Sequence, residues 1–294
     1  MNVSCIDNIV TAKGVKDFNL SQILECGQCF YFDRIDETEY EAYQVVAFDR
    51  AVRMEQTGDT FRIIGSSLED FERIWKRYLD MDNDYSVIKT AVIKADEALS
   101  TAVNEKDGIR ILNQDFFETL ISFIISQNKN IPQIKQCVKN ISNKYGDAII
   151  GYNGETFYSF PKVEALYNAT EEGLRECKVG FRAPYIKSAA NAVYSGAVTK
   201  EKLDNLDVNE ARKLLMTIKG VGEKVANCVL LFGLGRREAF PVDVWMKRIM
   251  EQMYFGGEDR SKAELEAFAV EKFGEYSGYA QQYLFDYART VLFK

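Results

Sequence analysis

The chain has 294 residues, of which 47% are hydrophobic and 28% charged, a composition typical of a soluble globular protein with one large domain or two ordinary ones. It contains no histidine, which excludes Ser-His-Asp triads, Cys-His dyads, histidine-ligated zinc and the HExxH motif. Its formal net charge of −7 is unusual for a nucleic-acid-binding protein, although binding depends on the charge of one face rather than of the whole surface.

Six cysteines are present, and only Cys26 and Cys29 form a CxxC pair. No second pair completes a zinc site and the spacing of an iron–sulfur cluster is missing, so we expect no metal and no cofactor. The pattern favours a reduced protein with buried thiols, with a thioredoxin-like redox site as an alternative. No apolar run approaches the ~20 residues of a membrane span and the first ten residues do not resemble a signal peptide, so we expect a cytoplasmic protein without membrane association.

The first third of the chain has the pattern of short strands separated by turns. Three segments rich in β-forming side chains, together with residues 29–32, predict an antiparallel sheet: 42–48, 51–56 and 60–65. From Leu68 onward the apolar residues follow a helical period almost to the end of the chain. Strands first and helices later indicate an α+β fold, with an antiparallel β-sheet domain over residues 1–110 and a larger helical domain over residues 111–294.

The helical part carries basic stretches inside an acidic chain. Residues 117–146 have a net charge of +3, and residues 212–248 have a net charge of +5. Solvated helix faces produce such stretches more often than DNA binding does, so this pattern alone is weak evidence for a nucleic-acid partner.

Residues 210–234 have the pattern of two apolar helices joined by a tight turn that contains Gly220 and Gly222. Two glycines two positions apart permit a tight turn and the close approach of another backbone, and the amides that start the second helix would hold a phosphate. This pattern is typical of a helix-hairpin-helix DNA-binding element. For the glycines alone, a corner between two helices that binds no ligand is the alternative.

Lys224 lies in the first turn of the second helix, where the helix macrodipole disfavours a cation. The same field favours the neutral amine, which is the form that attacks an electrophilic carbon. A contact to DNA phosphate explains a lysine at this position equally well when it is considered alone.

Asp243 follows Lys224 by nineteen positions, in the segment 240–245 with the sequence FPVDVW. It is a candidate N-cap for the helix that runs toward Tyr254. A carboxylate at a helix N-terminus also stays ionised, and it stabilises an oxocarbenium-like sugar cation. GVGEK followed by PVD is specific as a combination, so residues 240–245 form the candidate catalytic loop.

This combination, KGVGEKVANC followed by AFPVDVWM, resembles the helix-hairpin-helix DNA glycosylase superfamily, and within it the 8-oxoguanine DNA glycosylases of the eukaryotic type. Four further stretches occur in the family's order with similar spacing: Glu25–Phe30, Ser126–Ile131, Gly180–Ala183 and Gly278–Phe285. The resemblance implies an N-terminal antiparallel sheet domain packed on the helical domain, with the lesion pocket between them. The absence of histidine and the departures described below lead us to expect a bacterial member.

The resemblance also implies roles for single residues. Lys224 matches the nucleophile that displaces the base at C1′ and forms a Schiff base, and Asp243 matches the carboxylate that stabilises the sugar cation and assists proton transfer. Gly27 matches the glycine whose carbonyl accepts a hydrogen bond from N7–H of 8-oxoguanine. Normal guanine has an acceptor at N7, so such a carbonyl discriminates against it. A glycine that only permits a turn is the alternative for Gly27.

Further matches concern the flipped base and the gap that it leaves. Cys228 and Phe285 match the residues that sandwich the base, and Gln281 matches one that reads its Watson–Crick edge, although ordinary core packing is an alternative for each. Asn128 matches the residue that fills the gap. Phe181 matches the wedge beside the partner base, with phenylalanine in place of the usual tyrosine.

Three positions depart from the eukaryotic pattern. Lys129 and Gln133 replace an asparagine and an arginine that contact the partner cytosine, whereas Arg182 is retained. Trp245 replaces a histidine near a phosphate. We therefore expect relaxed specificity for the base opposite the lesion.

These observations predict a monomeric bifunctional DNA glycosylase and AP lyase that excises 8-oxoguanine from double-stranded DNA through a lysine Schiff base followed by β-elimination. A superfamily relative that acts on another lesion and a non-catalytic DNA-binding scaffold are the alternatives. Lys224 together with Asp243 disfavours the scaffold, and Lys224 disfavours monofunctional alkyl-base or adenine glycosylases. The missing iron–sulfur cysteines disfavour the endonuclease III type.

Overall fold

Six strands near the N-terminus form one antiparallel sheet in the order β1-β2-β6-β5-β4-β3. The structure is a computed structural model that describes residues 1–37 and 39–292, with the backbone alone for residues 291 and 292. The strands are β1 (Asn2–Ile6), β2 (Ile9–Lys13), β3 (Phe32–Ile35), β4 (Glu41–Ala47), β5 (Arg50–Thr57) and β6 (Thr60–Ile64). The three predicted strands coincide with β4, β5 and β6. The predicted strand at residues 29–32 begins only at Phe32, and the hairpin of β1 and β2 was not predicted.

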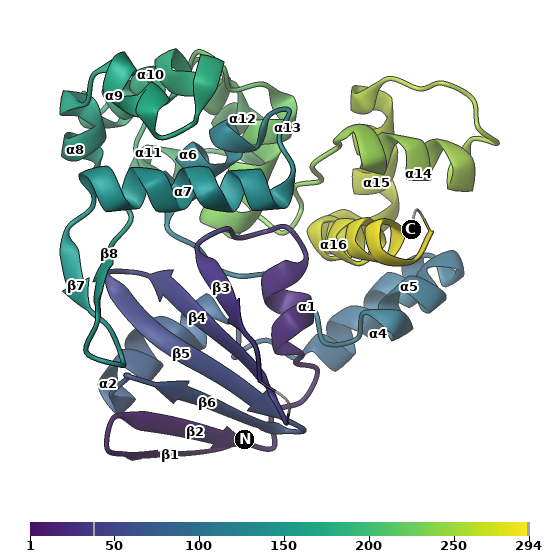
Figure 1. Ribbon diagram of the computed structural model, residues 1–294. Helices are drawn as coiled ribbons and strands as arrows, with labels where there is room; N and C mark the ends of the chain where they lie inside the picture. The colour runs from purple at the N-terminus through teal and green to yellow at the C-terminus, as the bar shows by residue number, and fades with distance from the viewer. Residues whose placement is uncertain (38, 293–294) are drawn as a thin grey trace.

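Apart from α1, which lies between β2 and β3, the described helices follow the sheet, as the α+β prediction required, and they make up most of the remaining chain (Figure 1). They are α1 (Leu20–Glu25), α2 (Leu68–Asp70), η1 (Phe71–Trp75), α3 (Lys76–Tyr78), α4 (Tyr85–Ala95), η2 (Glu97–Leu99), α5 (Ser100–Glu105), α6 (Phe116–Ser126), α7 (Ile131–Tyr145), α8 (Val163–Asn168), α9 (Glu171–Glu176), η3 (Gly180–Arg182), α10 (Ala183–Tyr194), α11 (Lys200–Asp204), α12 (Val208–Met216), α13 (Glu223–Cys228), η4 (Val229–Gly233), α14 (Val244–Tyr254), α15 (Lys262–Phe273), η5 (Gly274–Tyr276), α16 (Ser277–Tyr287) and η6 (Ala288–Leu292). Within the described residues, no helix is both long enough and apolar enough to cross a membrane.

Two hydrophobic cores lie side by side. One core is formed by the sheet with the helical segment α2–η1–α3, where Tyr43, Met54, Phe71 and Trp75 are fully buried. The other core belongs to the helices, and α6 passes through it with nearly every residue buried. A helix that is buried all round has a fixed axis, and α6 runs from its N-cap Asp115 to Ser126. α6 therefore provides a rigid reference for the site described below.

Segments far apart in the chain meet beside the sheet. The helices α4 and α5 pack against α16, on the side away from the β7–β8 hairpin (Figure 1). Gln282 of α16 donates from Nε2 to the carbonyl of Cys26 at 3.0 Å, and Arg289 donates to the carbonyl of Glu25. The loop after α1 is thus fastened to the last long helix. The division of the chain at residue 110 stays a prediction.

A second hairpin was not predicted either. β7 (Ala148–Ile150) and β8 (Thr156–Tyr158) extend from the helical part toward the sheet (Figure 1). The amide of Tyr152 in its turn donates to the carbonyl of Ala51 in β5 at 3.2 Å. This hairpin links the helical part to the sheet.

Candidate active site

The predicted hairpin is present as α12, a turn, and α13, which continues as the π-helical turn η4. Arg212 of α12 donates to the side chain of Asn227 in α13 at 2.9 Å and pairs with Glu266 of α15 at 2.5 Å. Asn227 also donates to Glu266, so a buried polar network fixes the angle between the two helices.

The two positions of the turn hold glycine for different physical reasons. Gly220 has φ +88°, and a Cβ there would lie 2.3 Å from the ring of Tyr185, so the fold itself requires glycine. Gly222 is the N-cap of α13 with φ −101°, and a Cβ there would meet nothing within 4 Å. Neither backbone strain nor internal packing explains Gly222. The open space beside it suits the close approach of an external backbone.

Lys224 is the second residue of α13 and is half-buried. Its Nζ lies 3.3 Å from Oγ of Ser126, at the C-terminal end of α6, and 4.9 Å from the centre of the Phe123 ring. The amine therefore has a hydroxyl partner and an apolar floor, and within the described residues it has no carboxylate partner. This environment stabilises an ammonium less than an ion pair does.

Asp243 caps α14, as the sequence suggested, and accepts from the amide of Met246 at 2.8 Å through Oδ1. Oδ2 accepts no hydrogen bond from the described residues, and the side chain is half-buried at the edge of a cavity. One oxygen of the carboxylate thus caps the helix while the other is left for a ligand. The capping and catalytic interpretations of Asp243 are compatible.

One open cavity of about 750 Å³ joins seven of the predicted site residues. They are Asn128, Lys129, Gln133, Gly222, Lys224, Asp243 and Trp245. The cavity is also lined by Ser126 and Lys262, which the sequence analysis did not single out. Lys262 lies in the first turn of α15, where the helix dipole disfavours a cation. The same unfavourable position singled out Lys224 in the sequence, so Lys262 could have been found by the same argument. Among the described residues, no three His, Cys, Asp or Glu side chains gather as metal ligands.

The loop between α6 and α7 forms one wall of this cavity. Asn128 at its tip is exposed and has φ +52°, a left-handed conformation that asparagine tolerates better than most residues. Gln127 beside it donates to the carbonyl of Gly220 at 3.0 Å. The loop that was predicted to fill the gap in DNA is therefore tied directly to the hairpin turn.

The three side chains predicted near the partner base are all engaged within the protein. Gln133 completes a capping box on α7, because its Oε1 accepts from the amide of Asn130 at 3.2 Å. Lys129 lies beside the Cys137 thiol, whose pKa is raised by burial and lowered in part by this ammonium. Arg182 is only 4% exposed and donates to the carbonyls of Gln127, Asn128 and Val179.

Phe181, in contrast to these three side chains, is exposed to solvent. It is 56% exposed, with the guanidinium of Arg182 4.2 Å from its ring centre and the ring of Tyr185 6.1 Å away at 80°. An aromatic ring that is held at its base and exposed at its edge has the form of a wedge.

Three of the four predicted lesion-binding residues, Gly27, Gln281 and Phe285, lie at a different place, where α16 meets the loop after α1. Gly27 has φ +83°, and a Cβ there would lie 3.3 Å from the ring of Phe285. Gln281, one turn earlier on α16, is 5% exposed, and its Oε1 is buried without a hydrogen-bond partner. A buried acceptor that has no partner is costly, and a ligand donor would satisfy it.

Cys228 lies one turn after Lys224 and is fully buried. Burial raises the pKa of its thiol to about 11, the Lys224 ammonium lowers this pKa in part, and the Asp243 carboxylate raises it further. Cys228 is therefore within electrostatic range of both catalytic candidates.

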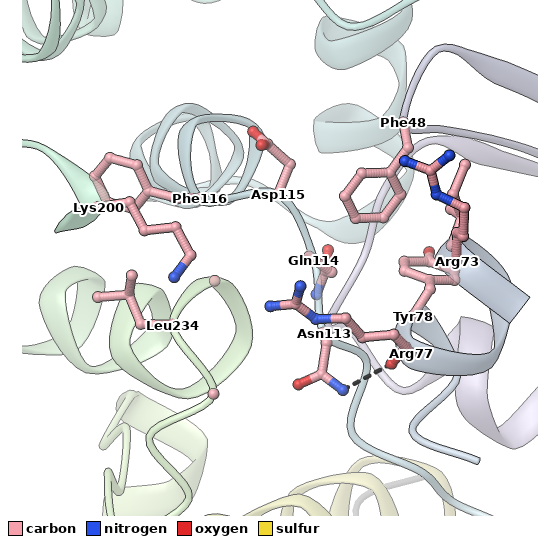
Figure 2. A pocket seen from close by; sticks show the side chains of 13 residues that line it. Phe48, Arg73, Arg77, Tyr78, Asn113, Gln114, Asp115, Phe116, Lys200 and Leu234 are labelled. Carbon is pink, nitrogen blue, oxygen red and sulfur yellow. Dashed lines mark hydrogen bonds between the residues drawn. The ribbon is translucent and has the colours of Figure 1, made fainter. Parts of the chain in front are cut away.

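A second cavity lies at the other end of α6 (Figure 2). It has a volume of about 290 Å³, and Arg77, Asp115 and Lys200 are among the residues that line it. None of the predicted site residues borders this cavity, and the 11 residues of α6 separate it from Ser126 by roughly 16 Å. The two predicted catalytic residues, Lys224 and Asp243, both line the larger cavity at the hairpin.

Comparison with known proteins agrees with this geometry. Residues 10–120 match the family model described as 8-oxoguanine DNA glycosylase, N-terminal domain, and residues 121–275 match the model described as HhH-GPD superfamily base excision DNA repair protein. The probable N-glycosylase/DNA lyase of Methanothermobacter thermautotrophicus is 35% identical over 243 residues, which cover 75% of this chain and 74% of that protein. The N-glycosylase/DNA lyase of Saccharomyces cerevisiae is 35% identical over 211 residues, covering 60% of this chain and 56% of that protein.

Among solved structures, the Clostridium acetobutylicum 8-oxoguanine glycosylase/lyase in complex with duplex DNA containing cytosine opposite 8-oxoguanine is 39% identical. The TM-score is 0.93, and the match covers 98% of each chain. The chain therefore belongs to the 8-oxoguanine DNA glycosylase branch of the HhH-GPD superfamily, a family of base excision DNA glycosylases with DNA lyase activity.

Proposed function

We propose that this protein extrudes 8-oxoguanine from duplex DNA, excises it with Lys224 as the nucleophile, and cleaves the strand by β-elimination. The observation that carries the proposal is the common cavity of Lys224, Asp243, Asn128 and Gly222. It joins a candidate nucleophile, a carboxylate with a free oxygen, a residue at the tip of a loop, and an open approach to backbone amides.

In the proposed reaction the neutral amine of Lys224 attacks C1′ of the extruded nucleotide, and the bond from C1′ to N9 of the base breaks. The free oxygen of Asp243 stabilises the positive charge that develops on the sugar. Opening of the sugar ring gives a Schiff base between Nζ and C1′. Loss of a proton from C2′ then expels the 3′ phosphate, and hydrolysis of the imine regenerates the lysine.

Selection of the damaged base is assigned to the second cluster. No described residue donates a hydrogen bond to the carbonyl of Gly27, which leaves it available to the N7–H that 8-oxoguanine has and guanine lacks. The unpartnered Oε1 of Gln281 is a second acceptor, and Phe285 is the surface on which the base would stack. Cys228 is assigned to the other face of the base.

Weak dependence on the opposite base forms part of the same proposal. Lys129, Gln133 and Arg182 are each engaged by protein groups, so none is free to form a bidentate contact with cytosine. Trp245, which is 46% exposed on the cavity rim, takes the position of a histidine that contacts phosphate in eukaryotic members.

The test is incubation of the purified protein with duplex oligonucleotides that each carry one defined lesion, with and without borohydride. We expect excision of 8-oxoguanine, strand cleavage, and a trapped protein–DNA adduct that disappears in Lys224→Gln while binding of the lesion is retained. Adduct formation at the wild-type level in Lys224→Gln would refute the assignment of the nucleophile. Excision of an alkylated base but not 8-oxoguanine would favour another lesion specificity.

A further inference from the structure

The catalytic cavity contains a cation that the proposed reaction leaves without a role. Its lining includes Lys129, Lys224 and Lys262 against the single carboxylate of Asp243, so its net charge is +2 within a protein whose overall formal charge is −7. Lys224 is assigned to the chemistry, and Lys129 lies beside the thiol of Cys137. Lys262 is the cation that remains.

Lys262 is placed where a purely structural lysine is unfavourable. It is the first residue of α15, after the N-cap Ser261, and the positive end of the helix dipole repels an ammonium there. By contrast, Lys272 lies in the last turn of the same helix, where the dipole favours a cation, and pairs with Asp96 at 3.4 Å. The position of Lys262 is therefore more favourable when an anionic partner from outside the helix is bound.

The protein does not supply that partner. Lys262 is exposed and makes no hydrogen bond or ion pair with the described residues. The nearby carboxylates are already in use, because Glu251 and Asp259 pair with Lys247 and Glu258 pairs with Arg260. The charge of Lys262 is thus available to a ligand in the cavity.

We propose that Lys262 binds a backbone phosphate of the lesion-bearing strand next to the extruded nucleotide. The proposal rests on the proposed function insofar as that function places DNA in this cavity. A lysine is a mobile point charge, which suits a phosphate better than a base edge. Gly222 and Lys224 at the start of α13 line the same cavity as Lys262. Lys262 would thus hold the strand whose sugar lies at Lys224 and Asp243.

The experiment measures the salt dependence of binding to a duplex with a tetrahydrofuran abasic analogue, which has neither a base to excise nor an aldehyde to react with Lys224. We compare the wild type with Lys262→Gln, Lys262→Arg and the control Lys94→Gln. Lys94 is exposed on α4 and has no partner among the described residues. Loss of one phosphate contact lowers the magnitude of the slope of log Kobs against log salt by ~0.9. The ratio of the wild-type affinity to the Lys262→Gln affinity should therefore fall about eightfold between 0.05 and 0.5 M salt.

We expect this change for Lys262→Gln only, with the slope retained in Lys262→Arg and Lys94→Gln and with unchanged melting temperatures. An unchanged slope in Lys262→Gln would overturn the proposal, as would a loss of affinity that is equal at all salt concentrations. Failure of the proposed function would look different, because the wild type would then neither excise 8-oxoguanine nor form the borohydride adduct, whatever the slope at Lys262.

Discussion

At the scale of single residues, Asp243 combines an observed capping role with a proposed catalytic role. Its Oδ1 caps α14 and its Oδ2 accepts no hydrogen bond from the described residues, so the two roles would use different atoms of one carboxylate. Both interpretations were available from the sequence because FPVDVW carries a capping signal and the family motif together. Which oxygen serves which purpose depends on a side-chain rotamer, and no sequence pattern specifies it.

We predict that Asp243→Asn separates the two functions. Asparagine remains a good N-cap, so the melting temperature should change little. Loss of the preorganised negative charge should reduce single-turnover excision by about 10²–10³-fold, a few kcal/mol of transition-state stabilisation. Single-turnover kinetics beside a melting curve checks this. A loss of activity no larger than the loss of stability accounts for would make Asp243 a cap alone.

The two hairpin glycines allow a second prediction at this scale. Gly222→Ser should keep or slightly raise stability, since serine is a strong N-cap and a side chain there meets nothing within 4 Å. The same side chain should obstruct the DNA backbone and weaken duplex binding about tenfold or more, a loss of ~1.4 kcal/mol. Melting curves and fluorescence anisotropy measure the two effects.

Gly220→Ala is the matched control for this prediction. Its φ of +88° and the ring of Tyr185 at 2.3 Å should make the substitution destabilising by roughly 1–3 kcal/mol. Equal DNA affinity in Gly222→Ser and the wild type would show that the backbone of the turn is not approached by DNA.

At the scale of elements, the start of α7 combines a structural position with a proposed recognition position. Gln133 completes the capping box with Asn130, so its amide oxygen is committed, while its NH₂ group has no partner among the described residues. The sequence identified Gln133 as a poor substitute for arginine, but it left the residue free to donate or accept. The structure leaves it a donor, and every base offers an acceptor.

We therefore predict similar single-turnover rates of 8-oxoguanine excision opposite cytosine, adenine, guanine and thymine. Gln133→Arg should restore part of the preference for cytosine, within the ~1–3 kcal/mol that one good base contact provides. Because arginine also breaks the capping box, Gln133→Glu is the control that keeps the box and removes the donor. A preference for cytosine of a hundredfold or more in the wild type would contradict the prediction.

The elements that the sequence did not predict share a physical cause. The β1–β2 hairpin and the β7–β8 hairpin are short, and strands of three to five residues carry too few side chains for a clear alternation. Cys29 and Phe30 are apolar and buried but lie in a loop before β3. By contrast, β4 and β5 span seven and eight residues. β6 has only five, but it follows β5 directly after the turn signal Gly58-Asp59, which marks it as the second strand of a hairpin.

At the scale of the whole molecule, charge is separated by region. The acidic chain carries a cavity at the hairpin with a net charge of +2, and its sequence already shows the basic stretches that contribute to it. The sequence could not predict that Lys129 lies beside the Cys137 thiol or that Arg182 is buried against the loop carbonyls, because both depend on tertiary contacts. Local charge is readable from sequence, whereas the direction of a charged side chain is not.

Glu118 on α6 gives a prediction for the stability of the whole protein. Loss of solvent and the nearby carboxylates of Asp115 and Asp49 raise its pKa from 4.5 to about 8. Between these values the folded state binds more protons at Glu118 than the unfolded state, so its contribution to stability is lost as pH rises from about 4.5 to 8 and is constant above that range.

Glu118→Gln should remove this loss. The quantity to compare is the melting temperature of the variant minus that of the wild type. We expect this difference to be larger at pH 8 than at pH 5 by about 2 °C or more, and to show no further increase at pH 9. Thermal unfolding at the three pH values checks this. A difference that does not change with pH would show that the carboxyl titrates normally in the folded protein.

The fastening of α16 to the loop after α1 has a consequence for biosynthesis. The donor Gln282 and the acceptor Cys26 are 256 residues apart, and Gly27 meets Phe285 across the same junction. During translation the sheet has all of its strands long before α16 leaves the ribosome, and contacts of such long range form late. The sheet and hairpin would already exist in a nascent chain in which Gly27 still lacks its contact with α16. Under the proposed function, the ability to bind the damaged base would therefore be acquired later than the sheet and the hairpin.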